Sequence, residues 1–157
     1  MQTVYIKTPL GTAEIIGGVN GVSAISILDV ETEISNEIPD FLELPIKELN
    51  EYFDFKRTAF TFKLQPQGTA FQQKVWQELI NIPFGKTVSY MDLSKKLGDI
   101  KAIRAVASAN GKNPLWIVIP CHRVIGTDGS LTGYAGGLWR KKWLLEHENP
   151  SNQGSLF

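Results

Sequence analysis

The chain has 157 residues, 43% of them hydrophobic, and its 16 basic and 16 acidic side chains leave no net charge. A chain of this length and composition can bury enough apolar surface for one domain or two small ones, which excludes disorder as the expected state. A single cysteine, no signal-peptide pattern and no run of about 20 apolar residues predict a cytoplasmic protein without a disulfide framework or a membrane span.

The first 64 residues predict a small α/β domain with an antiparallel sheet. Three short strands are expected over residues 3–11, 12–19 and 22–29. Asn20-Gly21, between the second and the third, is a strong hairpin signal. A helix is expected over 44–55, where apolar residues recur at helical spacing, and residues 59–64 alternate like another strand. Proline, glycine and polar residues over 65–68 then mark a linker.

Residues 69–150 predict a second, mainly helical domain, followed by a flexible tail over 151–157. Three helices are expected, over residues 70–82, 88–98 and 99–111. Thr69 is the expected N-cap of the first, and Gly98 and Gly111 close the other two. The expected apolar face of the first helix consists of Phe71, Val75, Trp76 and Leu79.

The last two of these helices resemble a helix-turn-helix, in which the second helix binds nucleic acid. That second helix carries the basic residues Lys101, Arg104 and Lys112 and small residues that include Ala105 and Ala109. Small residues allow close approach to another surface, which is either a neighbouring helix or a nucleic-acid groove. The helix pair alone does not decide between them.

The distribution of charge is uneven along the chain. Residues 69–143 hold eleven basic and four acidic side chains, whereas residues 1–68 hold five basic and ten acidic side chains. Such an asymmetry is expected where one half of a protein binds a polyanion, but a solvated surface explains the charge equally well.

Cys121 stands between Pro120 and His122, at the end of an apolar run. A buried, inert thiol is the commonest state of a free cysteine, and a structural zinc site needs more ligands than one cysteine and two histidines. A nucleophile is the third alternative, because a histidine can take the thiol proton and a carboxylate, here Glu146 or Glu148, can orient that histidine. Neighbours on extended backbone point to opposite sides, so a bend or a bridging water would have to connect thiol and imidazole.

Four separated motifs occur together in the second half of the chain. They are GKTVSYMDL (85–93), RAVASANGKNP (104–114), IPCHRV (119–124) and GYAGGLWRKKWLLEHE (133–148). In order and spacing they closely resemble the O6-alkylguanine-DNA alkyltransferases, also called methylated-DNA–protein-cysteine methyltransferases. The match runs from Gly68 to Glu148, whereas the first 64 residues resemble the family only in size and strand–helix order. The resemblance implies a ribonuclease H-like N-terminal domain and a winged-helix-like C-terminal domain.

The resemblance implies direct reversal of DNA damage. The protein would flip an O6-alkylguanine out of the duplex, with O4-alkylthymine as a further candidate substrate, and transfer the alkyl group irreversibly to its cysteine, so that each molecule reacts once. The catalytic residues implied are Cys121 as nucleophile, His122 as its base through a water, Glu148 as the partner of His122, Asn113 as a brace of the active-site turn and Tyr90 as a hydrogen-bond donor to the departing guanine. No cofactor is implied. Some members of the family bind zinc in the N-terminal domain, but residues 1–64 contain neither Cys nor His, so no metal is expected.

For DNA, the resemblance implies that the second helix of the pair enters the minor groove of the double-stranded substrate and that Arg104 replaces the flipped base. The other DNA-binding residues implied are Tyr90, Met91, Lys101, Ala105 and Ala109. The substrate pocket implied consists of Val124, Tyr134, Ala135 and Gly136. Many relatives carry serine in place of Ala135. Because Ala135 lacks the serine hydroxyl, contact to the guanine O6 is expected from a backbone N–H. The protein is expected to be a monomer.

The tail ends in QGSLF, which resembles the short motif by which bacterial repair and replication proteins bind the sliding clamp. Gln153, Leu156 and Phe157 would make the contacts, because two apolar anchors on a flexible peptide can fill a preformed pocket. An ordinary frayed terminus is the alternative.

Two other functional classes compete with alkyl transfer. Alkyltransferase-like proteins bind damaged DNA without reacting and have another residue, usually tryptophan, in place of the cysteine, so Cys121 argues against that class. A Cys-His hydrolase needs an oxyanion site, and the sequence offers no obvious one.

Overall fold

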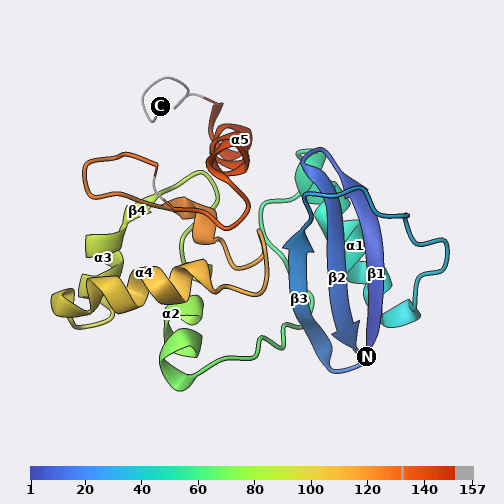
Figure 1. Ribbon diagram of the computed structural model, residues 1–157, viewed down its shortest axis with the longest axis horizontal. Coiled ribbons are helices and arrows are strands. Elements are labelled where there is room, and N and C mark those ends of the chain that lie inside the picture. The colour runs from blue at the N-terminus through green and yellow to red at the C-terminus, as the bar shows by residue number, and fades with distance from the viewer. Residues whose placement is uncertain (132, 151–157) are drawn as a thin grey trace. The chain divides into compact units, whose positions relative to one another are not determined.

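The computed structural model describes residues 1–131 and 133–150, which form two compact units (Figure 1). Unit 1 consists of Met1–Gln67 and Pro114–Val118, and unit 2 of Gly68–Asn113 and Ile119–Phe157. The described residues contain five α-helices, one antiparallel sheet and one parallel strand pair. The α+β class expected from the sequence is therefore confirmed.

The sheet of unit 1 consists of three antiparallel strands in the order β1-β2-β3. The strands are β1 (Gln2–Thr8), β2 (Gly11–Gly18) and β3 (Gly21–Ile27). Every second side chain is buried in β1 and β2, and the register places Val4 opposite Ile15 and Ile6 opposite Ala13. Because side chains alternate between the two faces of a strand, these buried residues form one apolar face of the sheet.

Strands β2 and β3 form the expected hairpin, but its turn is offset by one residue from Asn20-Gly21. Gly18 pairs with Gly21, so Val19 and Asn20 make the turn. Gly21 begins β3 with a φ of +141°, and a Cβ there would lie 3.0 Å from the carbonyl oxygen of Lys63. Glycine is required here because only glycine tolerates both this backbone angle and so close a neighbour.

Helix α1 (Asp40–Phe53) packs against the sheet of unit 1 (Figure 1). The helix begins four residues before Leu44, the expected start, because Asp40 and Glu43 place negative charge at the positive end of the helix dipole. Leu49 and Tyr52 are fully buried, in agreement with their helical spacing.

The strand expected over residues 59–64 is not formed. Only an isolated parallel bridge joins Leu64 to Val22 of β3. The buried carboxylate of Glu48 in α1 accepts hydrogen bonds from the backbone N–H of Thr61 at 2.8 Å and from its hydroxyl at 2.5 Å. A side chain of the helix therefore satisfies groups that a neighbouring strand would otherwise bind.

Helix α2 (Ala70–Ile80) begins in unit 2 with the expected N-cap. The hydroxyl of Thr69 accepts a hydrogen bond from the N–H of Gln72 at 3.1 Å, and the side chain of Gln72 accepts one from the N–H of Thr69 at 2.9 Å. This reciprocal capping box satisfies two backbone donors at the helix start. Val75, Trp76 and Leu79 form the expected buried face.

Phe71, the fourth residue expected on that face, is 39% exposed. The contact of α2 with the rest of unit 2 lies further along the helix, where the indole N–H of Trp76 donates to the carbonyl of Ala109 at 2.9 Å. The first turn of α2, which carries Phe71, is therefore outside the packed interface.

The helix expected over 99–111 consists of two pieces. A 3₁₀ turn, η1 (Ile100–Ala102), capped by the side chain of Asp99, leads into helix α4 (Ile103–Gly111). The preceding helix, α3 (Tyr90–Lys96), is capped by Ser89 and packs against α4 (Figure 1).

The small residues of α4 divide between two environments. Ala109 is 2% exposed and packs against α2, whereas Ala105 is exposed. Ala109 therefore allows close approach to a neighbouring helix, and the expectation that it contacts DNA stays a prediction.

Unit 2 is completed by a parallel strand pair and a last helix. Strand β4 (Val88–Ser89), directly before α3, pairs with β5 (Val124–Ile125). A 3₁₀ turn, η2 (Cys121–Arg123), directly precedes β5, and helix α5 (Leu138–Glu148) follows later in the chain. The strand pair therefore holds the residues that follow Cys121 next to the start of α3. Within the two described ranges, no helix is both long and apolar enough to cross a membrane.

Gly68→Ala should destabilise unit 2. A Cβ at Gly68 would lie 2.4 Å from Cη2 of Trp76, so the buried indole would have to move. Overpacking of this kind costs about 1–3 kcal/mol, and thermal unfolding should therefore show a lower Tm. An unchanged Tm would contradict this packing. Gly111→Ala is the control, because its Cβ would meet no atom within 4 Å and alanine is the better helix former.

Candidate functional site

The backbone bends sharply on both sides of Cys121. Pro120 has φ −81° and ψ 65°, and the N–H of Cys121 donates to the carbonyl of Ile119 at 2.8 Å, which together define an inverse γ-turn. The single turn η2 follows, closed by the N–H of Arg123 donating to the carbonyl of Pro120 at 3.0 Å. The bend expected at Pro120 is therefore formed, and the side chains of Cys121 and His122 leave a turn rather than an extended strand.

Asn113 braces this turn from the end of α4. Its side-chain amide donates to the carbonyl of Ile119 at 2.6 Å and also hydrogen-bonds Cys121. One side chain thus contacts both the residue at the start of the γ-turn and the thiol that follows it.

His122 is fully buried against Glu148, the last residue of α5. Its Nε2 lies 2.6 Å from Oε2 of Glu148, whereas Nδ1 has no hydrogen-bond partner among the described residues. Burial lowers the pKa of His122 below its ordinary value, and the opposing charge of Glu148 does not overcome this effect. The imidazole is therefore neutral near pH 7, with Nε2–H donating to Glu148 and a lone pair on Nδ1.

Glu148 also forms a bidentate ion pair with Arg123. Nε of Arg123 donates to Oε1 at 2.7 Å and Nη2 donates to Oε2 at 3.0 Å, while Nη1 donates to the carbonyl of Ile82 at 2.7 Å. Burial opposes ionisation of Glu148, but contact with His122 and Arg123 outweighs it and holds the pKa of the carboxyl well below its usual range. Glu146, the other candidate carboxylate, instead lies 4.0 Å from the ammonium of the exposed Lys142.

The thiol of Cys121 lies in an environment that keeps it protonated. Burial raises the pKa of Cys121, and the hydrogen bond from Asn113 and the charge of Lys141 oppose that rise only in part. Lys141 is itself fully buried in α5, and burial lowers its pKa to about 8. A base is therefore needed to generate the thiolate, and a nearby cation favours it once formed.

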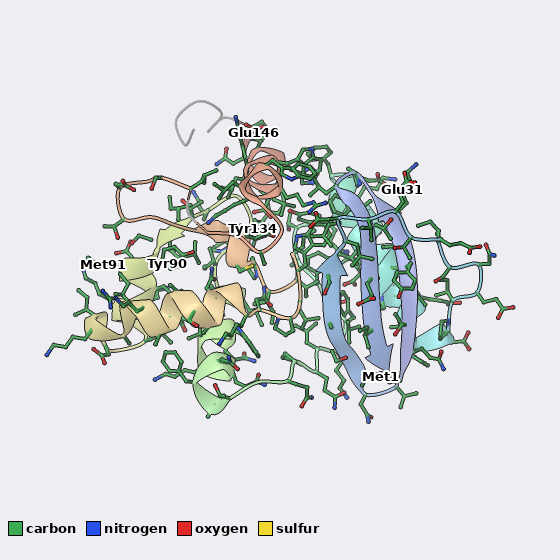
Figure 2. All side chains as sticks on the ribbon, in the orientation of Figure 1. Met1, Glu31, Tyr90, Met91, Tyr134 and Glu146 are labelled. Atoms are coloured by element: carbon green, nitrogen blue, oxygen red, sulfur yellow. The ribbon has the colours of Figure 1, made fainter. Side chains whose placement is uncertain are left out.

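A groove of about 540 Å³ in unit 2 collects several of the expected DNA and substrate residues. Tyr90, Arg104, Tyr134 and Ala135 line it, together with the small or apolar residues Ile103, Ala107, Gly111, Gly126, Thr127 and Gly133. One wall belongs to α3 and α4, and the other to the loops between β5 and α5. Figure 2 shows Tyr90 at the start of α3 and Tyr134 on the loop before α5.

The hydroxyl of Tyr90 has a buried polar neighbour in α4. The amide nitrogen of Asn110, a residue 3% exposed, lies 3.4 Å from this hydroxyl oxygen, and Oδ1 of Asn110 has no partner among the described residues. A tyrosine oxygen that accepts this hydrogen bond keeps its own O–H to donate elsewhere.

The remaining expected site residues occupy different environments. Met91 follows Tyr90 in α3 (Figure 2), Lys101 is exposed in η1, and Gly136 lies in the turn before α5. Val124 is fully buried in β5, where it pairs with Val88, so it supports the fold of the site and does not line the groove. The proposed tail contacts, Gln153, Leu156 and Phe157, lie outside the described residues.

Two side chains that contact the candidate site residues, Arg123 and Lys141, were not singled out in the sequence. Arg123 is visible only as part of the CHR triplet, and Lys141 stands in the basic run 140–142, which is typical of a solvated face. Nothing in that run distinguishes Lys141, because its burial follows from the orientation of α5.

Comparisons with known proteins agree on one family. A family model described as 6-O-methylguanine DNA methyltransferase, DNA binding domain, matches residues 70–150. The chain is 41% identical to the methylated-DNA–protein-cysteine methyltransferase of Methanosarcina barkeri over 150 residues, covering 91% of this chain and 94% of that protein. It is also 41% identical over 147 residues to the protein of the same name from Mycobacterium tuberculosis, covering 91% and 89%.

Solved structures give the same result for the fold. The chain resembles the crystal structure of Mycobacterium tuberculosis OGT in complex with DNA with a TM-score of 0.86 and 39% identity, covering 94% of this chain and 93% of that one. The match therefore extends over both units. On the family model, the identity to these relatives and the fold, the chain belongs to the O6-methylguanine-DNA methyltransferase family.

Proposed function

We propose that this protein repairs DNA by transferring the alkyl group from the O6 atom of guanine irreversibly to its own Cys121. The observation that carries the proposal is a buried thiol whose neighbour, His122, is neutral, has a lone pair on Nδ1 and is oriented by Glu148. The activity named for the relatives, methylated-DNA–protein-cysteine methyltransferase, supports it. O4-alkylthymine is proposed as a second substrate.

The reaction forms one bond and breaks one. The sulfur of Cys121 attacks the alkyl carbon as the bond from that carbon to the guanine oxygen breaks, and the bonding electrons stay on the base. The thiol proton passes through a water to Nδ1 of His122, and Glu148 stabilises the resulting imidazolium. Tyr90 donates a hydrogen bond to the departing guanine, which neutralises part of its developing charge. The product on sulfur is a stable thioether, so each molecule reacts once.

Two further residues serve the nucleophile in this proposal. Asn113 keeps the turn around Cys121 in place through its hydrogen bonds to Ile119 and to the thiol. Lys141 provides a positive charge that favours the thiolate as it forms. Both residues act on the nucleophile, whereas Tyr90 acts on the departing guanine.

DNA is proposed to bind through its minor groove against α4. The exposed Arg104 lines the protein groove of unit 2 and would take the place of the flipped base in the duplex. The exposed Ala105 would allow close approach of α4 to the DNA. Lys101 would contact phosphate without reading sequence, and Met91 would lie beside the DNA next to Tyr90. A repair protein that scans all sequences is suited to contacts of this kind.

The finer architecture and state of the protein belong to the same proposal. Unit 1, an antiparallel sheet covered by one helix, is proposed to be ribonuclease H-like, and unit 2, with its packed helix pair α3 and α4, winged-helix-like. The two domains are proposed to divide at the linker 65–68. We further propose a monomer that acts in the cytoplasm; sedimentation equilibrium at the mass of one chain would test the first point.

The tail is proposed to tether the protein to the replication sliding clamp through Gln153, Leu156 and Phe157. The support is the sequence QGSLF. Capture of purified clamp by the full chain, but not by a chain that lacks Leu156 and Phe157, tests this proposal.

Alkyl transfer is tested by following the label of an alkyl-labelled O6-alkylguanine in duplex DNA. One equivalent of label should be transferred to Cys121 per protein molecule and then stop, because the thioether formed is chemically stable. Cys121→Ser should accept none. Repeated turnover, or label released as free alcohol, would instead indicate a hydrolase, and binding without transfer would indicate a non-catalytic damage-binding protein.

Glu148→Gln should slow transfer by about 100-fold or more, because proton transfer by a positioned histidine contributes about 10²–10⁴-fold to a rate. The variant loses the charge that stabilises the imidazolium and leaves Arg123 without its buried counter-ion. Single-turnover rates with labelled duplex measure the effect, and a melting curve shows whether the fold survives. Glu146→Gln is the matched control two residues away and should react at the original rate, since Glu146 pairs only weakly with an exposed lysine. Equal rates for both variants would contradict the role of Glu148.

Arg104→Ala should slow repair in duplex DNA far more than reaction with free O6-benzylguanine. The reason is that the arginine replaces the extruded base and has no such task when the substrate is a free base. Rates with the two substrates, compared as a ratio, measure the effect. Lys7→Ala removes one charge from β1 of unit 1 and should leave that ratio unchanged; equal losses on both substrates for Arg104→Ala would refute base replacement.

A further inference from the structure

We infer that Arg140 is a positioning residue for alkyl transfer, which fixes the substrate-facing turn Tyr134–Gly137 through the carbonyl of Gly136. The inference rests on the proposed function. Arg140 falls within the motif at residues 133–148 but was not singled out there, because it stands in a basic run that resembles a solvated surface.

The turn itself is short and well defined. The N–H of Gly137 donates to the carbonyl of Tyr134 at 2.9 Å, which closes a four-residue turn directly before α5. Gly137 has a φ of +92°, a value that strongly favours glycine. Two residues of this turn, Tyr134 and Ala135, line the groove, so the orientation of the turn determines what the groove presents to a base.

Arg140 holds this turn from the first turn of α5. Its side chain is almost entirely buried, with the residue 5% exposed, and Nη1 donates to the carbonyl oxygen of Gly136 at 3.0 Å. The guanidinium lies over the ring of Trp139, with Cζ 4.5 Å from the ring centroid. The guanidinium is therefore held by the Trp139 ring on one side and by a hydrogen bond from Nη1 to Gly136.

The orientation of the turn is significant because position 135 has no side-chain donor. A serine hydroxyl at this position could rotate to reach the guanine O6, but Ala135 itself can offer only its backbone N–H for that contact. A backbone donor moves only with the turn. Stabilisation of a leaving group requires a donor within a few tenths of an ångström of its place, and a displacement of about 1 Å can cost 100-fold in rate.

The stacked geometry distinguishes arginine from lysine at this position. A lysine would retain the positive charge near the groove but could neither stack flat on Trp139 nor present a planar edge to Gly136. A role in positioning therefore predicts that Arg140→Lys and Arg140→Met are both impaired, whereas a role as a general positive charge for DNA predicts that only Arg140→Met is.

The test uses the full chain and duplex DNA that contains O6-methylguanine. For Arg140→Lys and Arg140→Met, the single-turnover rate at saturating DNA should fall about 10- to 100-fold, while the affinity for the duplex changes less than about threefold. Lys142→Met, an exposed lysine two residues along α5, is the control and should retain the original rate. An unchanged rate for Arg140→Lys, or a loss confined to affinity, would overturn the inference.

A rescue experiment separates positioning from a loss of fold. Ala135→Ser should raise the rate of Arg140→Met by a larger factor than it changes the rate of the unaltered protein, because a rotatable hydroxyl depends less on the orientation of the turn. An equal factor in both backgrounds would mean that Arg140 supports only the fold and would overturn the inference. Either result leaves the proposed function intact, since that function fails only if the unaltered protein does not become alkylated at Cys121.

Discussion

The carboxylate of Glu148 is the group on which the rest of the site depends. It is buried, and a buried charge is tolerated only when its oxygens are fully engaged. Arg123 supplies two hydrogen bonds and the compensating charge, and His122 supplies a third. Arg123 in turn binds the carbonyl of Ile82 beyond the end of α2. One carboxylate thus ties the end of α5 and the segment after α2 to the turn that carries the nucleophile.

This arrangement explains how a reactive cysteine remains unreactive until a substrate arrives. Burial favours the protonated thiol of Cys121, and burial also keeps His122 neutral. Because Nε2–H is committed to Glu148, Nδ1 is the nitrogen left to accept a proton, and in the proposed reaction it accepts one as the sulfur attacks. A preformed thiolate would be more reactive towards oxidants and other electrophiles. For a protein that can react only once, the protonated resting state is an advantage.

Local signals in the sequence accounted for much of the fold. Thr69 caps α2 because the Thr-x-x-Gln pattern supplies both hydrogen bonds within four residues, and Asn20-Gly21 located the β2–β3 hairpin to within one residue of its turn. The segment 59–64 was predicted wrongly because the backbone N–H and the hydroxyl of Thr61 bind Glu48, thirteen residues earlier in the chain, and only an isolated bridge at Leu64 joins the segment to β3. Lys141 and Arg140 were missed for a similar reason: their burial depends on how α5 packs, which a basic run does not reveal. Cys121 and His122 were candidates from their chemistry alone, but Glu148 could be selected over Glu146 only because separated motifs resembled a family, since no local pattern relates residues 26 positions apart.

The division of the chain into units has a consequence for how the protein can be taken apart. Residues 114–118 interrupt unit 2 and belong to unit 1, where Trp116 donates a backbone hydrogen bond to Ile25 of β3 at 3.0 Å. The chain therefore passes between the units three times, and the last passage is three residues before the thiol. Cleavage at a single peptide bond cannot yield two intact halves. A library that truncates or shuffles this protein at residues 65–68 would leave β3 without residues 114–118, which bind its backbone. Those residues would stay on the other fragment, directly before the segment that leads to Cys121.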